Sequence, residues 1–190
     1  MIGYYSEEEI NVLGFGAVGK NVKISKTATL YNIPNIYIGN NVRIDNFCVL
    51  AISGTGSLRI GNHVQISAFN FMNGMEDVVL EDLTTTAPYV GIFSSTDDYS
   101  GNSLTNATVP KEFLGTKSAP VIVRRYSIIG SGSTIMPGVI LEKGTAVAAH
   151  SFVNRSTKEF TIVGGNPAKF LKERERNLMN LEKNLENHES

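Results

Sequence analysis

Aliphatic residues recur at every sixth position over a long stretch in the second half of the chain, within VRRYSIIGSGSTIMPGVILEKGTAVAAHSFV. A helix repeats near 3.6 residues and a strand at 2, so neither element alone gives this spacing. Because six is a multiple of two, the pattern predicts short strands separated by regular corners. The aliphatic positions are Val123, Ile129, Ile135, Leu141, Val147 and Val153.

The same period is present in earlier blocks that begin at Val18, Ile38, Ile60 and Leu80. A second set of inward residues is expected at the fifth place of each hexad, where the side chains are small or β-branched. This set comprises Val22, Ala28, Val42, Cys48, Val64, Thr84, Val90, Ser127, Ser133, Val139, Thr145 and Ser151. The fourth place often holds Gly or Asn, which tolerate positive φ at a corner, namely Asn21, Asn41, Gly132, Gly138 and Gly144. Each hexad is therefore one flat side of a coil, and stacked coils bury a continuous ladder of aliphatic residues.

The two ends of the chain predict helices. Ser6 and Glu9 have the spacing of a capping box, so a short helix is expected over the first coil. After Pro167 the sequence favours a helix, with Leu171, Leu178 and Leu185 seven residues apart. Such a helix packs either along a partner chain or on its own domain. The expected organisation is a helical cap at 1–17, coils at 18–165 with a loop at 97–120, and a helix at 166–190.

Composition narrows the class of protein. The chain has 190 residues, 42% of them hydrophobic, and a net charge of −1, which suits one buried domain and gives no electrostatic reason to expect nucleic acid or an anionic membrane. No apolar run approaches a membrane span or a signal sequence, so a cytoplasmic location is expected. The single cysteine, Cys48, falls at an inward place and gives no disulfide framework.

The blocks IIGSGSTIMPGVI and TIVGGNPAKFLKER give the sequence a specific resemblance to the hexapeptide-repeat acyltransferases, over roughly residues 1–175. The resemblance implies an all-β fold, a left-handed parallel β-helix of roughly seven coils at three hexads per coil. It also implies an acyl-CoA co-substrate, either acetyl-CoA or a longer acyl-CoA, and a homotrimer with active sites between subunits.

The loop at 97–120 is where the resemblance places chemistry. In galactoside- and maltose-acetyltransferase-like members it carries a catalytic histidine, whose position falls here on Asp97, followed by Asp98 and Tyr99. The chain looks more like a subgroup with an S-x-DDYSG loop that modifies sugars of surface polysaccharides. The expected catalytic residues are Asp97, Asp98 and Glu142, and the expected substrate-binding residues are Ser67, Gln65, Asn70 and Tyr99. The alternative for Asp98 is a turn-forming residue, and for Glu142 a solvated surface charge.

The missing histidine bears on the acceptor. An alcohol must lose a proton whose pKa, like that of water, lies far above neutral pH, whereas an amine titrates near 8 and is already partly nucleophilic at pH 7. Transfer to oxygen therefore depends more on a general base than transfer to nitrogen. We expect an amino sugar linked to a nucleotide, such as a dTDP-4-amino-4,6-dideoxyhexose, used in glycan assembly. The open alternatives are an O-acetyltransferase, with an aspartate, Glu142 or His150 as base, and a β-helix that serves as a scaffold without catalysis.

The C-terminal coils resemble the acyl-CoA site of the family. The positions that match contacts to CoA are Ser131, Ala149, Asn154 and Arg155, and Lys169 and Lys172 suit its phosphates. The alternative for the two lysines is a role in solubility. A three-histidine zinc site, as in a β-helical carbonic anhydrase, is not expected, because only His63 and His150 fall on the coils. The inward place of Cys48 also favours direct attack on the thioester without a covalent intermediate.

Overall fold

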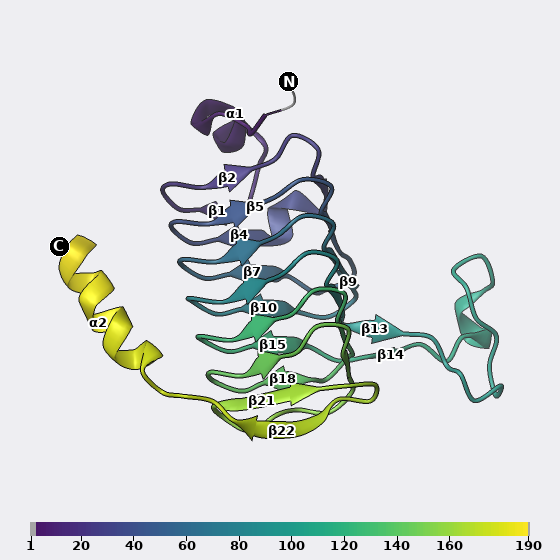
Figure 1. Ribbon diagram of the computed structural model, residues 1–190. Coiled ribbons are helices and arrows are strands. Elements are labelled where there is room, and N and C mark those ends of the chain that lie inside the picture. Colours follow the sequence, from purple (N-terminus) through teal and green to yellow (C-terminus); the bar gives the residue numbers. More distant parts are fainter. Residues whose placement is uncertain (1–2, 190) are drawn as a thin grey trace.

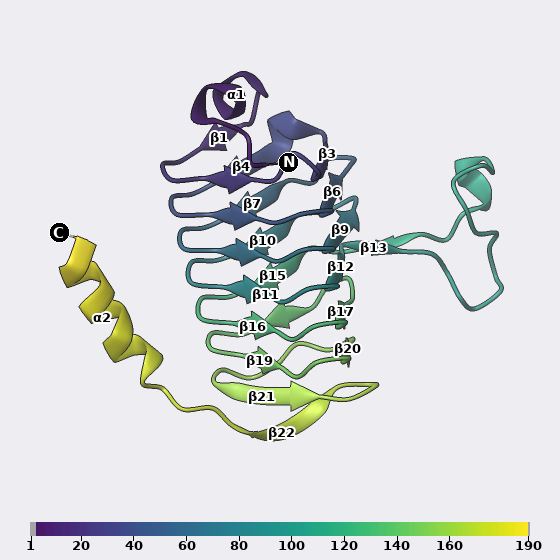
Figure 2. The ribbon, with the colours of Figure 1, turned by 45° about the horizontal axis from the view of Figure 1, so that its top comes forward.

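The computed structural model describes residues 3–189 and consists of a left-handed parallel β-helix with an N-terminal helix, a projecting arm and a C-terminal helix (Figures 1 and 2). The chain passes in turn along three flat faces, each a parallel sheet. Face 1 contains β1 (Ala17–Val18), β4 (Ile36–Ile38), β7 (Leu58–Ile60), β10 (Val78–Leu80), β15 (Val121–Val123) and β18 (Ile140–Leu141). Face 2 contains β2 (Lys23–Ile24), β5 (Arg43–Ile44), β8 (Gln65–Ile66), β11 (Thr85–Thr86), β16 (Ile128–Ile129), β19 (Ala146–Val147) and β21 (Thr161–Gly164). Face 3 contains β3 (Thr29–Tyr31), β6 (Val49–Ile52), β9 (Phe71–Gly74), β12 (Gly91–Phe93), β17 (Thr134–Ile135) and β20 (Phe152–Val153).

Three rows of turns join these faces and are named here by the faces they connect. Corner A leads from face 1 to face 2, corner B from face 2 to face 3, and corner C from face 3 back to face 1. On the first coil corner C contains η1 (Ile33–Asn35), and it is longest between β12 and β15. Successive coils pair in register, so that Ile60 faces Leu80 and Leu80 faces Val123.

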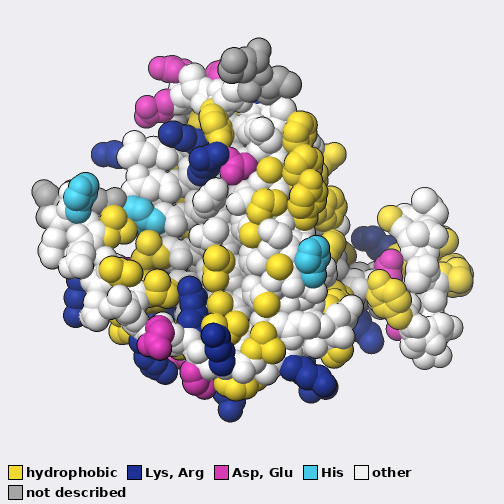
Figure 3. All heavy atoms as spheres, in the orientation of Figure 1, with side chains coloured by type: hydrophobic (Ala, Val, Ile, Leu, Met, Phe, Trp, Pro, Cys, Tyr) yellow, Lys and Arg dark blue, Asp and Glu magenta, His cyan; other side chains and the backbone are white. Residues whose placement is uncertain are grey.

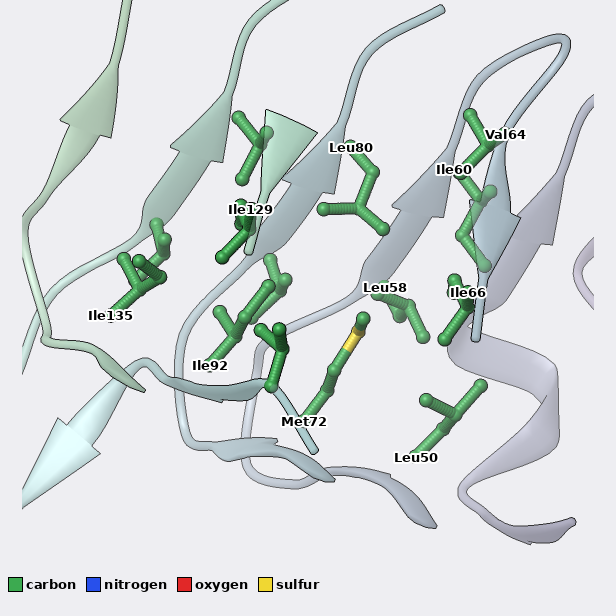
Figure 4. Packing of buried hydrophobic residues seen from close by; sticks show 14 of the residues in the cluster. Leu50, Leu58, Ile60, Val64, Ile66, Met72, Leu80, Ile92, Ile129 and Ile135 are labelled. Atoms are coloured by element: carbon green, nitrogen blue, oxygen red, sulfur yellow. The ribbon is translucent and has the colours of Figure 1, made fainter. Parts of the chain in front are cut away.

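The aliphatic position of each hexad points into the prism, as Figure 4 shows for Ile66, Ile92 and Ile129 among its labelled side chains. Ile66, Ile92, Ile129 and Leu141 are each fully buried. The six-residue period thus places one inward side chain on each face of a coil, usually aliphatic but Thr86 on β11, and the prediction of an all-β solenoid with about seven coils is confirmed.

The second inward set closes the corners. At Thr84, Thr145 and Ser151 the side chain donates to the carbonyl three residues earlier, for example Thr84 to Glu81 at 2.8 Å and Ser151 to Ala148 at 2.6 Å. Ser127 and Ser133 donate instead to carbonyls of the next coil. These hydroxyls are buried, so the bond satisfies both the hydroxyl and a corner carbonyl that no strand partner reaches. Small polar residues are therefore tolerated inside the prism.

The fourth place has positive φ at every predicted Gly and Asn, for example 56° at Asn41 and 70° at Gly132. The structure adds bulky residues that the sequence analysis did not anticipate there. Phe47, Phe69 and Tyr89 have φ of 59°, 61° and 62° at corner B. Their rings stack in a column, with centroids 5.1 and 4.8 Å apart. Ring stacking between successive coils thus offsets the conformational free energy that a left-handed backbone costs at each of these residues.

The N-terminal helix α1 (Glu7–Val12) begins after Ser6 and covers the first coil. The predicted capping box is present: Ser6 Oγ accepts from the Glu9 amide, and the Glu9 carboxylate accepts from the Ser6 amide. Ile10 is buried against the core, and Glu9 pairs with Lys26 at 2.6 Å. The helix therefore covers the open end of the apolar ladder, as predicted.

The C-terminal segment differs from the predicted continuous helix. Residues Lys169–Glu173 form β22, which runs antiparallel to β21 at the end of face 2. The prediction of helix was wrong here, because the last strand of the solenoid presents unpaired backbone groups that a returning strand satisfies. Helix α2 begins only at Leu178 and ends at Glu189. Leu171 thus lies on a strand and does not belong to a helical heptad.

Helix α2 is held to its own chain by an ion-pair network at corner A. The Glu182 carboxylate accepts hydrogen bonds from the Arg125 guanidinium and the Tyr126 hydroxyl, and Arg125 also pairs with Asp82 at 2.5 Å. Of the two alternatives, packing on its own domain is the one that these contacts support. Figures 1 and 2 show the helix alongside the coils at this side.

Candidate active site

An arm leaves the solenoid at corner C between β12 and β15 (Figure 1). Its stalk is formed by β13 (Ser95–Thr96) and β14 (Lys117–Ser118), which pair antiparallel. Residues 97–116 lie beyond this stalk and project away from the coils in both ribbon views. The insertion predicted at 97–120 therefore forms the arm, which contains the short helix η2 (Lys111–Phe113).

Asp98 organises the interior of the arm. Its carboxylate accepts from the Ser100 hydroxyl at 2.6 Å, the Ser100 amide at 3.1 Å and the Ser103 hydroxyl at 2.9 Å. These hydrogen bonds, mainly those from Ser100, hold the pKa of Asp98 below its usual value. Gly115 packs against this group so closely that an added Cβ would lie 2.3 Å from the Ser103 oxygen. The geometry is that of the turn-forming alternative, in which the carboxylate holds the loop together.

Asp97 directly follows β13, and its side chain is exposed at the stalk. It lines a pocket of about 610 Å³ between the arm and corner C, called here the arm-root pocket. The pocket combines amides and hydroxyls with apolar side chains, a lining suited to a polyhydroxylated ligand with apolar parts. Its lining residues include Ser53, Asn73, Met75, Ser95, Thr96, Asp97, Asn106, Val109, Lys111, Leu114 and Thr116.

The other residues predicted to bind substrate lie elsewhere. Tyr99 is 89% exposed on the arm and does not line the arm-root pocket. Gln65 lies on face 2, and its side-chain amide donates to Asp45 at 3.3 Å. Ser67 lies at corner B. Asn70 is buried, which differs from the surface contact predicted for it. Within one chain these residues and Asp97 do not share a pocket.

Asn70 acts on the backbone of corner B. Its amide nitrogen donates to the Ser67 carbonyl at 2.7 Å and to the Ala87 carbonyl at 2.9 Å, which ties two successive coils together. A contact with substrate through its own side chain is prevented by this burial, since an inward place faces the core. Any influence of Asn70 on a ligand passes through the backbone at Ser67.

Glu142 lies at corner A within a network of charges. Its carboxylate is 3.3 Å from Arg124, which also pairs with Glu81 at 2.8 Å. The side chain is partly exposed but already has a cationic partner. Corner A and the arm at corner C lie on different edges of the prism, so the chain does not bring Glu142 to Asp97.

A second pocket, of about 470 Å³, lies at the C-terminal end of the solenoid and is called here the C-terminal pocket. Arg155, Lys158 and Lys169 contribute cations to its wall, together with Ser156 and Thr157. Figure 3 shows several Lys and Arg side chains around this end of the molecule. Two of the residues predicted for CoA, Arg155 and Lys169, therefore meet at one pocket. Such a cluster of cations suits phosphate groups.

The remaining residues predicted for the acyl-CoA lie around this end. Asn154 is exposed next to Arg155, and Lys172 is exposed on β22 outside the pocket lining. Ser131 and Ala149 occupy corner B one coil apart, where Ala149 is exposed and Gly130 contacts its backbone closely. Because the side chains of Ser131 and Ala149 are small, they project little from corner B along the last coils.

Three groups that could carry other chemistry are accounted for. Cys48 is fully buried, and burial raises the pKa of its thiol to about 11, so it is a neutral core residue. His150 is exposed at corner B, and its ring fills the space that a side chain at Gly132 would occupy. His63 lies at corner A, near Asn41. Within residues 3–189 no three His, Cys, Asp or Glu side chains cluster as a metal site would require.

Several lining residues were not predicted from the sequence. In the arm-root pocket they include Asn73, Asn106 and Lys111, and in the C-terminal pocket Lys158. Asn73 lies one coil before the arm, so only the stacking of coils brings it close. Asn73 lies within β9, directly after the inward Met72, and a polar residue at that place is the sequence signal that would have indicated it.

The role of Asp98 predicts a local effect on the arm. Asp98→Ala should speed amide hydrogen exchange at Ser100 roughly tenfold, because the amide loses its acceptor. The thermal midpoint of the solenoid should not change. In the unaltered protein, the same protection should persist at neutral pH and be lost as the pH falls through the lowered pKa of Asp98. The control is Glu112→Gln, an exposed arm position, and equal exchange at Ser100 in both variants would contradict this role.

No helix in residues 3–189 has the length and apolar character needed to cross a membrane.

No family model matches the chain. A dTDP-4-amino-4,6-dideoxy-D-glucose acyltransferase from Escherichia coli is 40% identical over 181 residues, which cover 95% of this chain and 94% of that protein.

Solved structures agree with this relative. AntD, an N-acyltransferase from Bacillus cereus crystallised with dTDP and 3-hydroxybutyryl-CoA, superposes with a TM-score of 0.95 at 38% identity, over 100% of both chains. A variant of AntD in which one serine is replaced by alanine was crystallised with dTDP-4-amino-4,6-dideoxyglucose and coenzyme A. It superposes with a TM-score of 0.95 at 38% identity, over 99% of this chain and 100% of AntD. The similarity to these proteins spans the solenoid, the arm and both ends, and the chain belongs to the hexapeptide-repeat acyltransferase family.

Proposed function

We propose that the protein is an acyl-CoA-dependent N-acyltransferase that acylates the amine of a nucleotide-linked amino sugar. The acceptor is of the dTDP-4-amino-4,6-dideoxyhexose class, and the product serves glycan or polysaccharide biosynthesis. The observation that carries the proposal is similarity over the full length to an E. coli acyltransferase of this sugar nucleotide and to AntD bound to its amino sugar and acyl-CoA ligands.

The chemistry of the arm supports an amine as the nucleophile. Residues 97–116 contain Asp97 and Asp98 but no histidine. The neutral amine attacks the thioester carbonyl, so that a C–N bond forms and the C–S bond breaks. The amine proton passes to the exposed carboxylate of Asp97, which then gives it to the CoA thiolate as that group leaves. Because Asp98 is occupied by Ser100 and Ser103, Asp97 is the residue free to orient the amine.

A homotrimer with active sites between subunits fits this arrangement. Asp97 is on corner C, whereas Ser67, Ser131 and Ala149 are on corner B of the same chain. The arm projects away from its own coils (Figures 1 and 2), so it is placed to reach corner B of a neighbouring subunit. Glu142 and Tyr99 would then contact the acceptor only across such an interface.

The donor would occupy the C-terminal coils. Arg155 and Lys169 would hold the phosphates of CoA, with Asn154 and Lys172 at the margin, and the pantetheine arm would follow Ser131 and Ala149 along corner B. A cytoplasmic location stays a prediction from the sequence.

The choice of acceptor is tested with two sugar nucleotides that differ only at one position. Release of free CoA thiol should be seen with dTDP-4-amino-4,6-dideoxyglucose and should fall at least about 100-fold with the 4-hydroxy analogue, because the alcohol needs a base that the arm lacks. Turnover of the hydroxy compound alone would reject the proposal in favour of an O-acetyltransferase. Failure to bind any acyl-CoA by calorimetry would favour a scaffold.

Replacement of Asp97 tests its role at the amine. Asp97→Asn keeps the shape of the side chain but cannot accept a proton, so kcat should fall about 10- to 1000-fold with little change in the KM for acyl-CoA. Glu112→Gln, at an exposed arm position, is the matched control and should retain the parent rate. A rate for Asp97→Asn equal to that of the control would remove Asp97 from the mechanism.

The proposed CoA site predicts that the KM for the acyl donor depends on the nucleotide phosphates of CoA. Arg155→Gln and Lys169→Gln should each raise the KM for acyl-CoA about tenfold, because each removes a cation that meets phosphate. Neither should change the KM for the matching acyl-pantetheine, which lacks the nucleotide phosphates. Lys183→Gln on α2 is the control. Equal effects on both donors would place the phosphates elsewhere.

A further inference from the structure

The arm-root pocket contains two opposite charges that the protein leaves unpaired. Asp97 and Lys111 both line it. Among residues 3–189, neither side chain has an ion-pair partner or a hydrogen bond from another side chain. A pocket with one free anion and one free cation suits a ligand that carries the complementary pair.

Several charged side chains on the coils are paired within the chain instead. Arg43 pairs with Asp45 at 2.6 Å, Arg124 with Glu81 at 2.8 Å, and Lys26 with Glu9 at 2.6 Å. These charges are neutralised at the surface of the solenoid, where they stabilise corners and the N-terminal cap. Lys111 has no such partner among the described residues, and it lines the same pocket as the unpaired Asp97.

The arm holds Lys111 at the pocket through its own backbone. The Lys111 carbonyl accepts from the Leu114 amide at 3.0 Å, and the Phe113 carbonyl accepts from the Leu104 amide at 2.8 Å. Asn106 is fixed by Thr108, whose amide donates to its side chain at 3.0 Å. The cation therefore sits on an ordered segment, which lowers the entropy cost of binding a ligand.

We propose that Lys111 is a specificity-determining residue that binds the diphosphate of the sugar nucleotide in the arm-root pocket. This inference rests on the proposed function and deepens it. The amine of the hexose lies toward Asp97, the diphosphate lies toward Lys111, and the sugar ring lies between them. One subunit's arm and corner C thereby bind the acceptor from its amine to its phosphates.

The rest of the pocket suits the ring between these charges. Asn73 and Asn106 supply amides, and Ser95, Thr96 and Thr116 supply hydroxyls for the sugar oxygens. Met75, Val109 and Leu114 give an apolar wall suited to the methyl group of a 6-deoxy sugar. A volume of about 610 Å³ lies within the range of small-molecule sites.

The test compares Lys111→Gln with Lys117→Gln, the same charge change on the arm stalk outside the pocket lining. Lys111→Gln should raise the KM for the dTDP-linked amino sugar about tenfold, with kcat and the KM for acyl-CoA unchanged. The KM for the methyl glycoside of the same amino sugar, which carries no phosphate, should not change. Lys117→Gln should behave as the unaltered protein. An unchanged KM for the dTDP-linked sugar, or an equal rise for the methyl glycoside, would overturn the proposal.

Calorimetry with dTDP alone separates this inference from the proposed function. The unaltered protein should bind dTDP about tenfold more tightly than Lys111→Gln, whether or not any acyl group is transferred. If transfer fails but this difference is found, the diphosphate site stands and the proposed reaction falls. If transfer succeeds and both proteins bind dTDP equally, the reaction stands and Lys111 is not the diphosphate ligand.

Discussion

The structure depends on parallel pairing of successive coils in one unchanging register. Each strand of a coil hydrogen-bonds to the strand directly above and below it, as Leu80 does between Ile60 and Val123. Because the pairing is parallel, every coil must return to the same point. Paired positions are 18 residues apart from Val123 to Leu141 but 20 and 22 apart on the first coils, where corner C holds the extra residues. Six residues per face meet this requirement and place one aliphatic side chain inward on each face. A longer segment can be accommodated only where it leaves the prism, at a corner.

This constraint explains where chemistry can be placed. The interior is filled by the aliphatic ladder and by small polar residues such as Thr84 and Ser151 that close the corners. The surface of each face is a plain sheet. Pockets also lie along face 1 and beside α2, but the two pockets that contain the predicted ligand-binding residues form where the chain departs from the repeat, at the root of the arm and at the C-terminal end where β22 turns back. Both pockets contain charges or polar groups that the solenoid does not use.

Charges fall into two groups according to this geometry. At corner A, residues Glu81, Asp82, Arg124 and Arg125 neutralise one another and hold Glu182 of α2. Partly exposed pairs of this kind contribute modestly to stability and fix the position of the helix. The charges that line the two pockets are available to a ligand. The paired charges at corner A thus stabilise the fold, whereas those at the two pockets belong to the proposed acceptor site on the arm and the proposed CoA site at the end of the coils.

The sequence by itself determined the solenoid, because a period of six leaves few other ways to bury an aliphatic residue every sixth position. It also determined the capping box at Ser6, since that motif is local, and it identified the arm as the segment without repeat. Asp97, Arg155 and Lys169, which were predicted from the sequence, each line one of two pockets, and their roles stay predictions.

Only the tertiary structure decided features that depend on neighbouring coils. Phe69 accepts a left-handed backbone because Phe47 and Tyr89 stack on it, which local preference does not predict. Residues 169–173 form a strand because the last coil needs a partner for its backbone, although their side chains favour a helix. The sequence likewise could not separate the free carboxylate of Asp97 from that of Asp98, which Ser100 and Ser103 occupy, because hydrogen bonds depend on contacts within the folded arm.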